Sequence, residues 1–333
     1  MFENGTNLGD LTDGTVYGNL GKAYSNALFS MNRHENNDNR QAPNDHQGFT
    51  FFVRPMMNFS RNNLKNDRLL YSLLTTKTET VESHVRMMFD RLLYFNENMN
   101  HPFTDNLSFY IPILSNNLDS LSGFPDVAVD SYVSPSGSRK QQYNLLDGTD
   151  EINESIDVNA VFRNTYEDAV VKFISPWIRY MVKVKEGILS PYSGFIGRRM
   201  VDYHSRIFRL VMTEDKRFVK RICATGPIYP DVNEVGKYFN VAAGRIYNDE
   251  IKTHSIKFKC MGVEYDDPIL LKEFNMTAGA FNPMIRKINN GATPESVGLI
   301  KLSPIGEVGI KNRGWCRINL KTKELEWYVE KKV

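Results

Sequence analysis

Two segments of alternating apolar and polar residues, joined by a short charged turn, stand out in the second half of the sequence. They make up residues 205 to 226, SRIFRLVMTEDKRFVKRICATG. In the first segment Ile207, Arg209 and Val211 fall on one face of an extended chain, and the residues between them fall on the other. This period of two predicts an antiparallel hairpin around the Glu-Asp-Lys turn.

More sheet is predicted downstream of this hairpin. Residues 251 to 265, IKTHSIKFKCMGVEY, alternate again, and residues 315 to 330, WCRINLKTKELEWYVE, indicate a second hairpin around a Lys-Thr-Lys turn. A short helix broken by Pro283 is expected over residues 277 to 290. The C-terminal half is therefore mainly antiparallel sheet.

Helices are predicted mainly before residue 190. Thr76 and Glu79 have the spacing of a capping box at the start of an amphipathic helix over residues 78 to 95. Apolar pairs that repeat every four residues predict a long helix over residues 165 to 186. Pro176 lacks the amide hydrogen that would bond to the carbonyl four residues earlier, so we expect this helix to kink or divide there.

The first half also contains candidate strands and a candidate loop. FTFFVRP, residues 49 to 55, predicts a strand that Pro55 ends, and FYIPILS, residues 109 to 115, predicts a short strand or extended piece. Residues 134 to 155 are rich in turn formers and predict an exposed loop. The predicted fold class is α+β, with a helical N-terminal half, a kinked long helix and an antiparallel sheet in the C-terminal half.

The sequence divides into three regions. Residues 1 to 48 include the polar run NRHENNDNRQAPNDHQG and too few apolar side chains to offset the entropy of ordering. They predict an extended assembly arm, with a plain disordered terminus as the alternative. Residues 49 to 150 form a mixed α/β docking region, and residues 151 to 333 form the long helix with an antiparallel β domain.

Charge argues against a polyanion as the main partner. Lys and Arg number 41 against 39 Asp and Glu, so the net charge of +2 gives no long-range field toward nucleic acid or an anionic membrane. The basic cluster of Lys216, Arg217, Lys220 and Arg221 is interpreted as a solvated hairpin face. A DNA-contacting head–tail connector that uses this cluster stays open as an alternative.

Cysteine usage and hydropathy predict the compartment. Cys223, Cys260 and Cys316 lie far apart without zinc-ligand spacing, which indicates buried thiols in a reducing compartment. The N-terminus lacks the basic and apolar regions of a signal peptide, and no stretch approaches about 18 uninterrupted apolar residues. We therefore expect a chain made in the cytoplasm that neither carries a cleaved signal nor spans a membrane.

The sequence contains no motif for phosphate binding, nucleophilic catalysis or metal chelation, so no catalytic residue, metal or cofactor is predicted. The most enzyme-like cluster is DYHSR, which places Asp202 beside His204 and Ser205. A hydrolase that uses Asp202 and His204 with an acid from residues 264 to 267 is the alternative hypothesis.

Two adjacent carboxylates, Asp266 and Asp267, precede Pro268 in VEYDDPILLKEFN. Adjacent side chains of an extended chain point to opposite faces, so these two would share a proton or a cation only if the backbone turned sharply. An Asp before Pro favours an extended or turn conformation. The pattern therefore predicts a turn that ends a strand, followed by a new strand or helical turn.

Four phrases are informative in combination. They are FTFFVRPMMNF (49 to 59), DYHSRIFRLVM (202 to 212), TGPIYPDVNEVGKYFNV (225 to 241) and IKFKCMGVEYDDPILLKEFN (256 to 275). Together they resemble a family of virion structural proteins from the tail, baseplate and neck modules of large-genome tailed bacteriophages. The last phrase is similar to the sheet segment of tail-tube-like proteins, in which a strand leads into a charged turn beside a neighbouring subunit.

The resemblance implies a structural, non-enzymatic component that forms or joins a hexameric ring in the tail tube, baseplate or neck. Its partners would be copies of itself and other tail, baseplate or neck proteins, with genomic DNA only in passage and no membrane contact. It would belong to the virion and assemble in the host cytoplasm. The residues that the resemblance places at a subunit contact or a docking surface are Phe51, Phe52, Arg54, Phe59, Val263, Tyr265, Asp266, Asp267 and Leu270.

Overall fold

The computed structural model of the chain describes residues 48–75, 77, 80–93, 104–127, 131–147, 155–164, 168–213, 215–240, 252–302 and 314–331. Backbone contacts divide the chain into two compact units, Met1–Gln47 and Gly48–Val333. The predicted arm of residues 1 to 48 lies outside the described residues except for Gly48. The second unit contains every described element.

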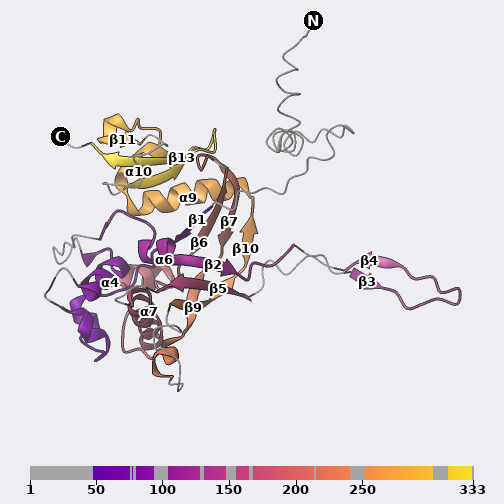
Figure 1. The fold of residues 1–333 in the computed structure, drawn as a ribbon, viewed down its shortest axis with the longest axis horizontal. Coiled ribbons are helices and arrows are strands. Elements are labelled where there is room, and N and C mark those ends of the chain that lie inside the picture. The colour runs from indigo at the N-terminus through magenta and orange to yellow at the C-terminus, as the bar shows by residue number, and fades with distance from the viewer. Residues whose placement is uncertain are drawn as a thin grey trace, which may run out of the picture. The chain divides into compact units, whose positions relative to one another are not determined.

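A four-stranded antiparallel sheet in the order β1-β6-β7-β10, here called the first sheet, forms one layer of this unit (Figure 1). Its strands are β1 (Gly48–Phe52), β6 (Ile207–Met212), β7 (Val219–Thr225) and β10 (Val263–Tyr265). β6 and β7 form the hairpin predicted from alternation. The predicted strand at residues 49 to 55 is confirmed as β1, which pairs with β6 along its whole length.

A second four-stranded antiparallel sheet has the order β2-β5-β9-β8. Its strands are β2 (Leu118–Ser122), β5 (Ser155–Arg163), β9 (Thr253–Met261) and β8 (Ile228–Asn233). Every second residue of β5 from Val158 and of β9 from His254 is buried, so one face of this sheet covers the core. β9 was predicted from its alternation, whereas the central strand β5 was not.

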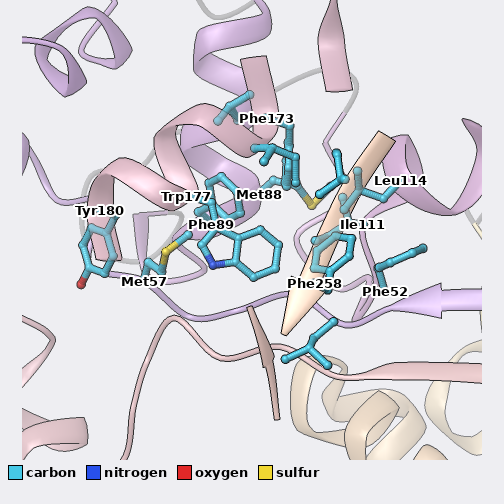
Figure 2. Close-up of a cluster of buried hydrophobic side chains, with 14 of the residues drawn as sticks. Phe52, Met57, Met88, Phe89, Ile111, Leu114, Phe173, Trp177, Tyr180 and Phe258 are labelled. Carbon is cyan, nitrogen blue, oxygen red and sulfur yellow. The ribbon is translucent and has the colours of Figure 1, made fainter. Parts of the chain in front are cut away.

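The long helix α7 (Ala169–Lys185) packs its apolar stripe into this core. Trp177 is fully buried, and its ring lies 5.6 Å from that of Phe89 on α4 (Val81–Phe89). Phe89 in turn lies 4.2 Å from Phe173, and the ring of Trp177 lies 6.5 Å from that of Phe258 on β9 (Figure 2). Burying each large apolar side chain stabilises the fold by about 1.5–3 kcal/mol relative to exposure. Both predicted helices are confirmed with shorter bounds.

Two helix predictions differ in detail from the structure. The N-cap of α4 is Thr80, whose hydroxyl accepts a hydrogen bond from the Ser83 amide at 3.3 Å, while the expected capping residue Thr76 lies outside the described residues. Pro176 sits inside α7, which continues as one helix across it. Of the two expected outcomes at Pro176, a division is wrong, because the packed aromatic stripe on both sides holds the helix together. A kink at Pro176 stays a prediction.

A second core lies on the other face of the first sheet. There α9 (Pro268–Phe281) lies between the first sheet and a three-stranded sheet, and α10 (Pro283–Asn289) packs against α9 (Figure 1). That sheet has the order β11 (Leu299–Lys301), β13 (Leu325–Glu330) and β12 (Trp315–Ile318). β12 and β13 confirm the predicted final hairpin. The predicted break at Pro283 is confirmed as well, since Asn282 caps a new helix there.

The remaining elements are short. They are α3 (Arg61–Leu64), α6 (Pro112–Asn117), α8 (Ser193–Arg198), the strands β3 (Ser131–Val133) and β4 (Asn144–Leu146), and 3-10 turns at Leu70–Leu73, Val235–Phe239 and Glu295–Val297. The strand expected over residues 109 to 115 is wrong from Pro112 onward, where the proline occupies the first turn of α6. Within the expected loop of residues 134 to 155, β4 pairs with β3.

The described residues form a mixed α and β structure with antiparallel sheets. A helical N-terminal half is not confirmed, because β5 precedes residue 190 and α9 and α10 follow it. The sheets draw strands from both sides of residue 150, since β1 pairs with β6 and β2 pairs with β5.

Candidate assembly site

The two four-stranded sheets exchange strands at one corner. β7 of the first sheet leads into β8 of the second through Gly226, and β9 of the second leads into β10 of the first through Gly262. The Gly226 amide donates to the Gly262 carbonyl at 2.9 Å. A Cβ on Gly226 would lie 1.9 Å from the Met261 oxygen, and Gly262 has φ +75°. Only residues without a side chain let the two crossings lie this close.

Asp266 and Asp267, just beyond this corner, take different structural roles. Asp266 has φ +52°, and its carboxylate accepts hydrogen bonds from the Ile222 amide at 3.1 Å and from Arg221 Nε at 2.7 Å. Asp267 is the N-cap of α9, because its Oδ1 accepts the Ile269 amide at 2.8 Å. The predicted turn at the end of a strand is confirmed, and the carboxylates do not form a proton-sharing pair.

Tyr265 fastens a loop over the first sheet. Its hydroxyl donates to the Pro125 carbonyl at 2.6 Å, which holds the segment after β2 above the strands. A pocket of about 340 Å³ lies between this segment and the strands. Tyr265 and Asp266 line it together with Val127, Arg209 and Cys223. The corner therefore presents a partly apolar, partly charged hollow at the molecular surface.

Six of the nine residues expected at an interface are buried within the subunit. Val263 and Leu270 are buried at the corner, and the other four lie in or after β1; they are Phe51, Phe52, Arg54 and Phe59. Only Tyr265, Asp266 and Asp267 keep substantial exposure. Contact of any of the nine with a neighbouring subunit stays a prediction. The six buried residues can influence the surface only indirectly, because they hold β1, β10 and α9 in place.

Arg54, one of these six buried residues, forms several hydrogen bonds within the subunit. The side chain is 2% exposed, and its guanidinium donates to the carbonyls of Met88 at 2.8 Å, Met87 at 3.0 Å and Ser108 at 3.0 Å. Burial lowers the pKa of Arg54 to about 10, and the nearby Asp105 carboxylate opposes that change. Arg54 therefore ties β1 to the end of α4 and to the segment before α6.

The proposed hydrolase cluster does not converge. Tyr180 donates to Asp202 Oδ2 at 2.5 Å, and burial raises the pKa of this Asp202 carboxyl. The His204 ring stacks on Tyr229 with 5.8 Å between centroids, and burial lowers the pKa of His204. Ser205 donates to the Val53 carbonyl at 2.5 Å. Each side chain has a different structural partner, so the geometry supplies no Ser-His-Asp relay.

Charged residues elsewhere are also engaged. In the basic cluster, Arg217 pairs with Glu324 at 3.3 Å and Arg221 with Asp266 at 2.6 Å. No group of three or more His, Cys, Asp or Glu side chains in the described ranges could hold a metal ion. Across the same ranges, no helix has the length and apolar character needed to cross a membrane.

Sequence reasoning missed Arg209 as a site residue. Its signal was present in the first hairpin, where it stands between Ile207 and Val211 on one face of β6. A cation in an otherwise apolar row is unusual unless it has a partner. Alternation alone identified the face but not the pocket beside it.

The described residues define a mixed α and β protein built on antiparallel sheets. The chain belongs to the family described as "putative phage tail tube protein", whose model matches residues 9–332. It is therefore a structural component of a phage tail, as the four phrases of the sequence suggested. No curated protein matches the chain.

Three solved structures from contractile injection systems are similar to parts of the chain. The tube-terminating cap of the anti-feeding prophage shares 11% identity over 48% of this chain and 83% of that one, with a TM-score of 0.29. The sheath/tube terminator of the extracellular PVC system, in its extended state, shares 8% identity over 45% of this chain and 85% of that one, with a TM-score of 0.26. The PVC sheath–tube complex shares 12% identity over 47% of this chain and 82% of that one, with a TM-score of 0.27. At such TM-scores the assignment rests on the family match.

Proposed function

We propose that the protein acts without catalysis, by self-assembly into a hexameric ring in the tail tube, baseplate or neck. The observation that carries this proposal is the hairpin β3–β4. Five of its large apolar side chains are 48–74% exposed: Tyr132, Val133, Tyr143, Leu145 and Leu146. A two-stranded hairpin is marginally stable by itself, and clustered apolar exposure marks interaction surfaces. A neighbouring subunit would cover these side chains.

The second sheet supplies a geometry for ring closure. Its four strands alternate in direction, so the edge strands β2 and β8 run opposite to each other. Within the described ranges the outer edge of β8 is covered only at Ile228, by a bridge to Ser205, and no strand covers β2. A copy rotated about an axis along the strands would bring its β2 antiparallel to β8, and closure of the ring removes both edges.

The other regions then take supporting roles in the proposal. Residues 1 to 48 would be an arm that binds an adjacent protein, residues 49 to 150 the docking region, and residues 151 to 333 the main body. Tyr265, Asp266 and Asp267 would lie near the subunit contact, supported from inside by the buried residues. Assembly would take place in the host cytoplasm with other tail proteins as partners, and DNA would pass through the ring without being held by it.

The test is mass photometry of the purified full chain, with negative-stain images of any large species. We expect rings of about six subunits. The variant Leu145→Ser with Leu146→Ser should shift the population toward monomer while the circular dichroism spectrum stays unchanged, because both side chains are already exposed in the monomer and its fold does not depend on them. Leu320→Ser is a matched control, since Leu320 is 50% exposed in the turn between β12 and β13.

Two results would refute the proposal. One is a wild-type chain that stays a compact monomer at the highest concentration reached. The other is a ring population that Leu320→Ser reduces as much as the hairpin variant does, because the apolar hairpin would then have no special role in assembly.

A further inference from the structure

Arg209 is a half-buried cation whose hydrogen-bonding capacity is mostly unused. It lies on β6 in a row that crosses the first sheet from Thr50 through Arg209 and Cys223 to Tyr265. Its guanidinium donates one hydrogen bond, from Nη1 to Thr50 Oγ1 at 2.9 Å. In the described part of the chain, its other N–H groups find no acceptor and no carboxylate lies within ion-pair distance.

The contrast with Arg54 shows that this arrangement is unusual within the same protein. Arg54 is buried and donates to carbonyls from two separate segments, so its charge is offset by oriented dipoles. Burial lowers the pKa of Arg209 as well, but the only opposing influence is the Cys223 thiol. The Arg209 nitrogens that lack a protein partner are not fully buried, so an acceptor that enters from solvent can reach them.

Arg209 lines the pocket of about 340 Å³ at the corner. Its walls include Val127, Val211 and Cys223, which are weakly polar or apolar. The other cation there, Arg221, is already paired with Asp266 at 2.6 Å. A fourth charged residue, Asp126, is exposed to water, which screens its charge. Arg209 is therefore the cation still available to a ligand.

The guanidinium of Arg209 lies close to the backbone of β1. An ideal Cβ on Gly48 would lie 3.0 Å from Arg209 Cζ and 2.3 Å from the Leu210 oxygen. The absence of a side chain at Gly48 therefore leaves room for the guanidinium beside β1. A planar guanidinium held in place by the sheet can present two parallel N–H groups to a carboxylate.

We propose that this pocket binds a carboxylate attached to an apolar group, with Arg209 as the anchor. One unpaired guanidinium matches the single charge of a carboxylate, while a doubly charged phosphate would need further donors that the walls do not provide. The apolar walls would take the rest of the ligand. The carboxylate can come from an acidic side chain of a second copy of this chain or from a free small molecule.

Binding is tested on the full chain with phenylacetate as the probe and phenylacetamide as its uncharged counterpart, by isothermal titration calorimetry. Phenylacetate should bind, and Arg209→Met should weaken it roughly tenfold to a hundredfold, the range expected for a hydrogen bond to a charged group. Arg68→Met is the control, because Arg68 is exposed and lies outside the pocket. Absent binding, equal binding of acid and amide, or equal binding by wild type and Arg209→Met would overturn the proposal.

Thermal stability separates a ligand anchor from a structural arginine. Arg209→Met keeps most of the apolar stem and removes an under-bonded charge, so we expect its melting temperature to match or exceed that of the wild type. Arg54→Met, which leaves several carbonyls without donors, should melt well below the wild type. A comparable fall in both variants would show that Arg209 is structural and would overturn the proposal.

Ring formation then identifies the source of the carboxylate. If Arg209→Met binds no phenylacetate and also forms no rings by mass photometry, the natural ligand is an acidic side chain of a neighbouring copy. If rings persist, the natural ligand is a free carboxylate. The titration needs no ring, so a failure of the binding proposal can be told apart from a failure of the proposed assembly.

Discussion

Asp90 offers a direct test of how burial sets the pH dependence of stability. The residue follows α4 and is 1% exposed. Its carboxylate accepts hydrogen bonds from the Tyr192 hydroxyl and, at 2.9 Å, from the Leu92 amide. Burial nevertheless raises the pKa of Asp90 from 3.8 to about 6, against the opposing influence of those bonds and of Arg86. In the native state, therefore, the charged form of Asp90 is disfavoured.

The difference between the pKa of Asp90 in the folded and the unfolded chain determines how the free energy of unfolding changes with pH. Below about pH 4 Asp90 is protonated in both the folded and unfolded chains, so it does not affect the free energy of unfolding. Between about pH 4 and pH 6 the unfolded chain loses the proton first, and stability falls as pH rises. Above about pH 6 both states are charged, and the loss reaches about 3 kcal/mol.

Asp90→Asn removes the charge and keeps the shape. The amide oxygen can still accept from the Leu92 amide, and the amide nitrogen can donate to the Tyr192 oxygen. We expect the variant to be more stable than the wild type at pH 7 by about 1–3 kcal/mol and to lose less stability between pH 4 and pH 6. Asp202 is also buried with a raised pKa, so some pH dependence should remain in Asp90→Asn.

The assay is urea unfolding at pH 4, 5, 6 and 7, followed by the fluorescence of the buried Trp177. Tyr192→Phe is a useful companion variant, because it removes a donor to the Asp90 carboxylate and should steepen the pH dependence. A wild-type and an Asp90→Asn chain with the same pH profile, or a variant less stable than the wild type at pH 7, would refute the reasoning. The pKa of Asp90 would then not be raised in the folded state.

Two further substitutions test the packing that positions the corner and the second core. Asn275→Ala should lower the free energy of unfolding by about 2–4 kcal/mol, because the Asn275 side chain forms hydrogen bonds to both the amide and the carbonyl of buried Ile318, each at 2.7 Å. Urea midpoints measure this change. Gly226→Ala should lower the melting temperature clearly, since its Cβ would lie 1.9 Å from the Met261 oxygen, whereas Gly236→Ala, whose Cβ meets nothing within 4 Å, should not. Equal effects at the two glycines would contradict the close crossing.

Alternation together with a local turn predicted two hairpins, whose strands are neighbours both in sequence and in space. The hairpins β6–β7 and β12–β13 were recognised because each contains both its faces and its turn. The strand β5 alternates as regularly, with Val158, Ala160 and Phe162 buried, yet it follows a polar stretch and pairs with β2 and β9. Its partners lie far away along the chain, so no local turn marks it as a strand.

The candidate site was harder to predict for a related reason. The resemblance to tail proteins placed the adjacent aromatic residues Phe51 and Phe52 at a docking surface. In the structure β1 lies between two cores, and Phe52 packs into one while Phe51 packs into the other. The sequence shows that both side chains must be covered, but it does not show that the same chain covers them. β10 is an edge strand of the first sheet, so Tyr265 at its end and Asp266 just after it stay at the surface.

Arg54 and Arg209 illustrate what decides between a structural and a binding role. Both are arginines within or just after a β-strand of the first sheet, flanked by apolar residues, yet the resemblance placed only Arg54 at a docking surface. Arg54 meets carbonyls at the end of α4 and before α6, which are supplied by segments more than thirty residues away. Arg209 meets one hydroxyl and a pocket. The number of acceptors that distant segments bring to a cation therefore determines whether it completes the fold or remains available to a ligand.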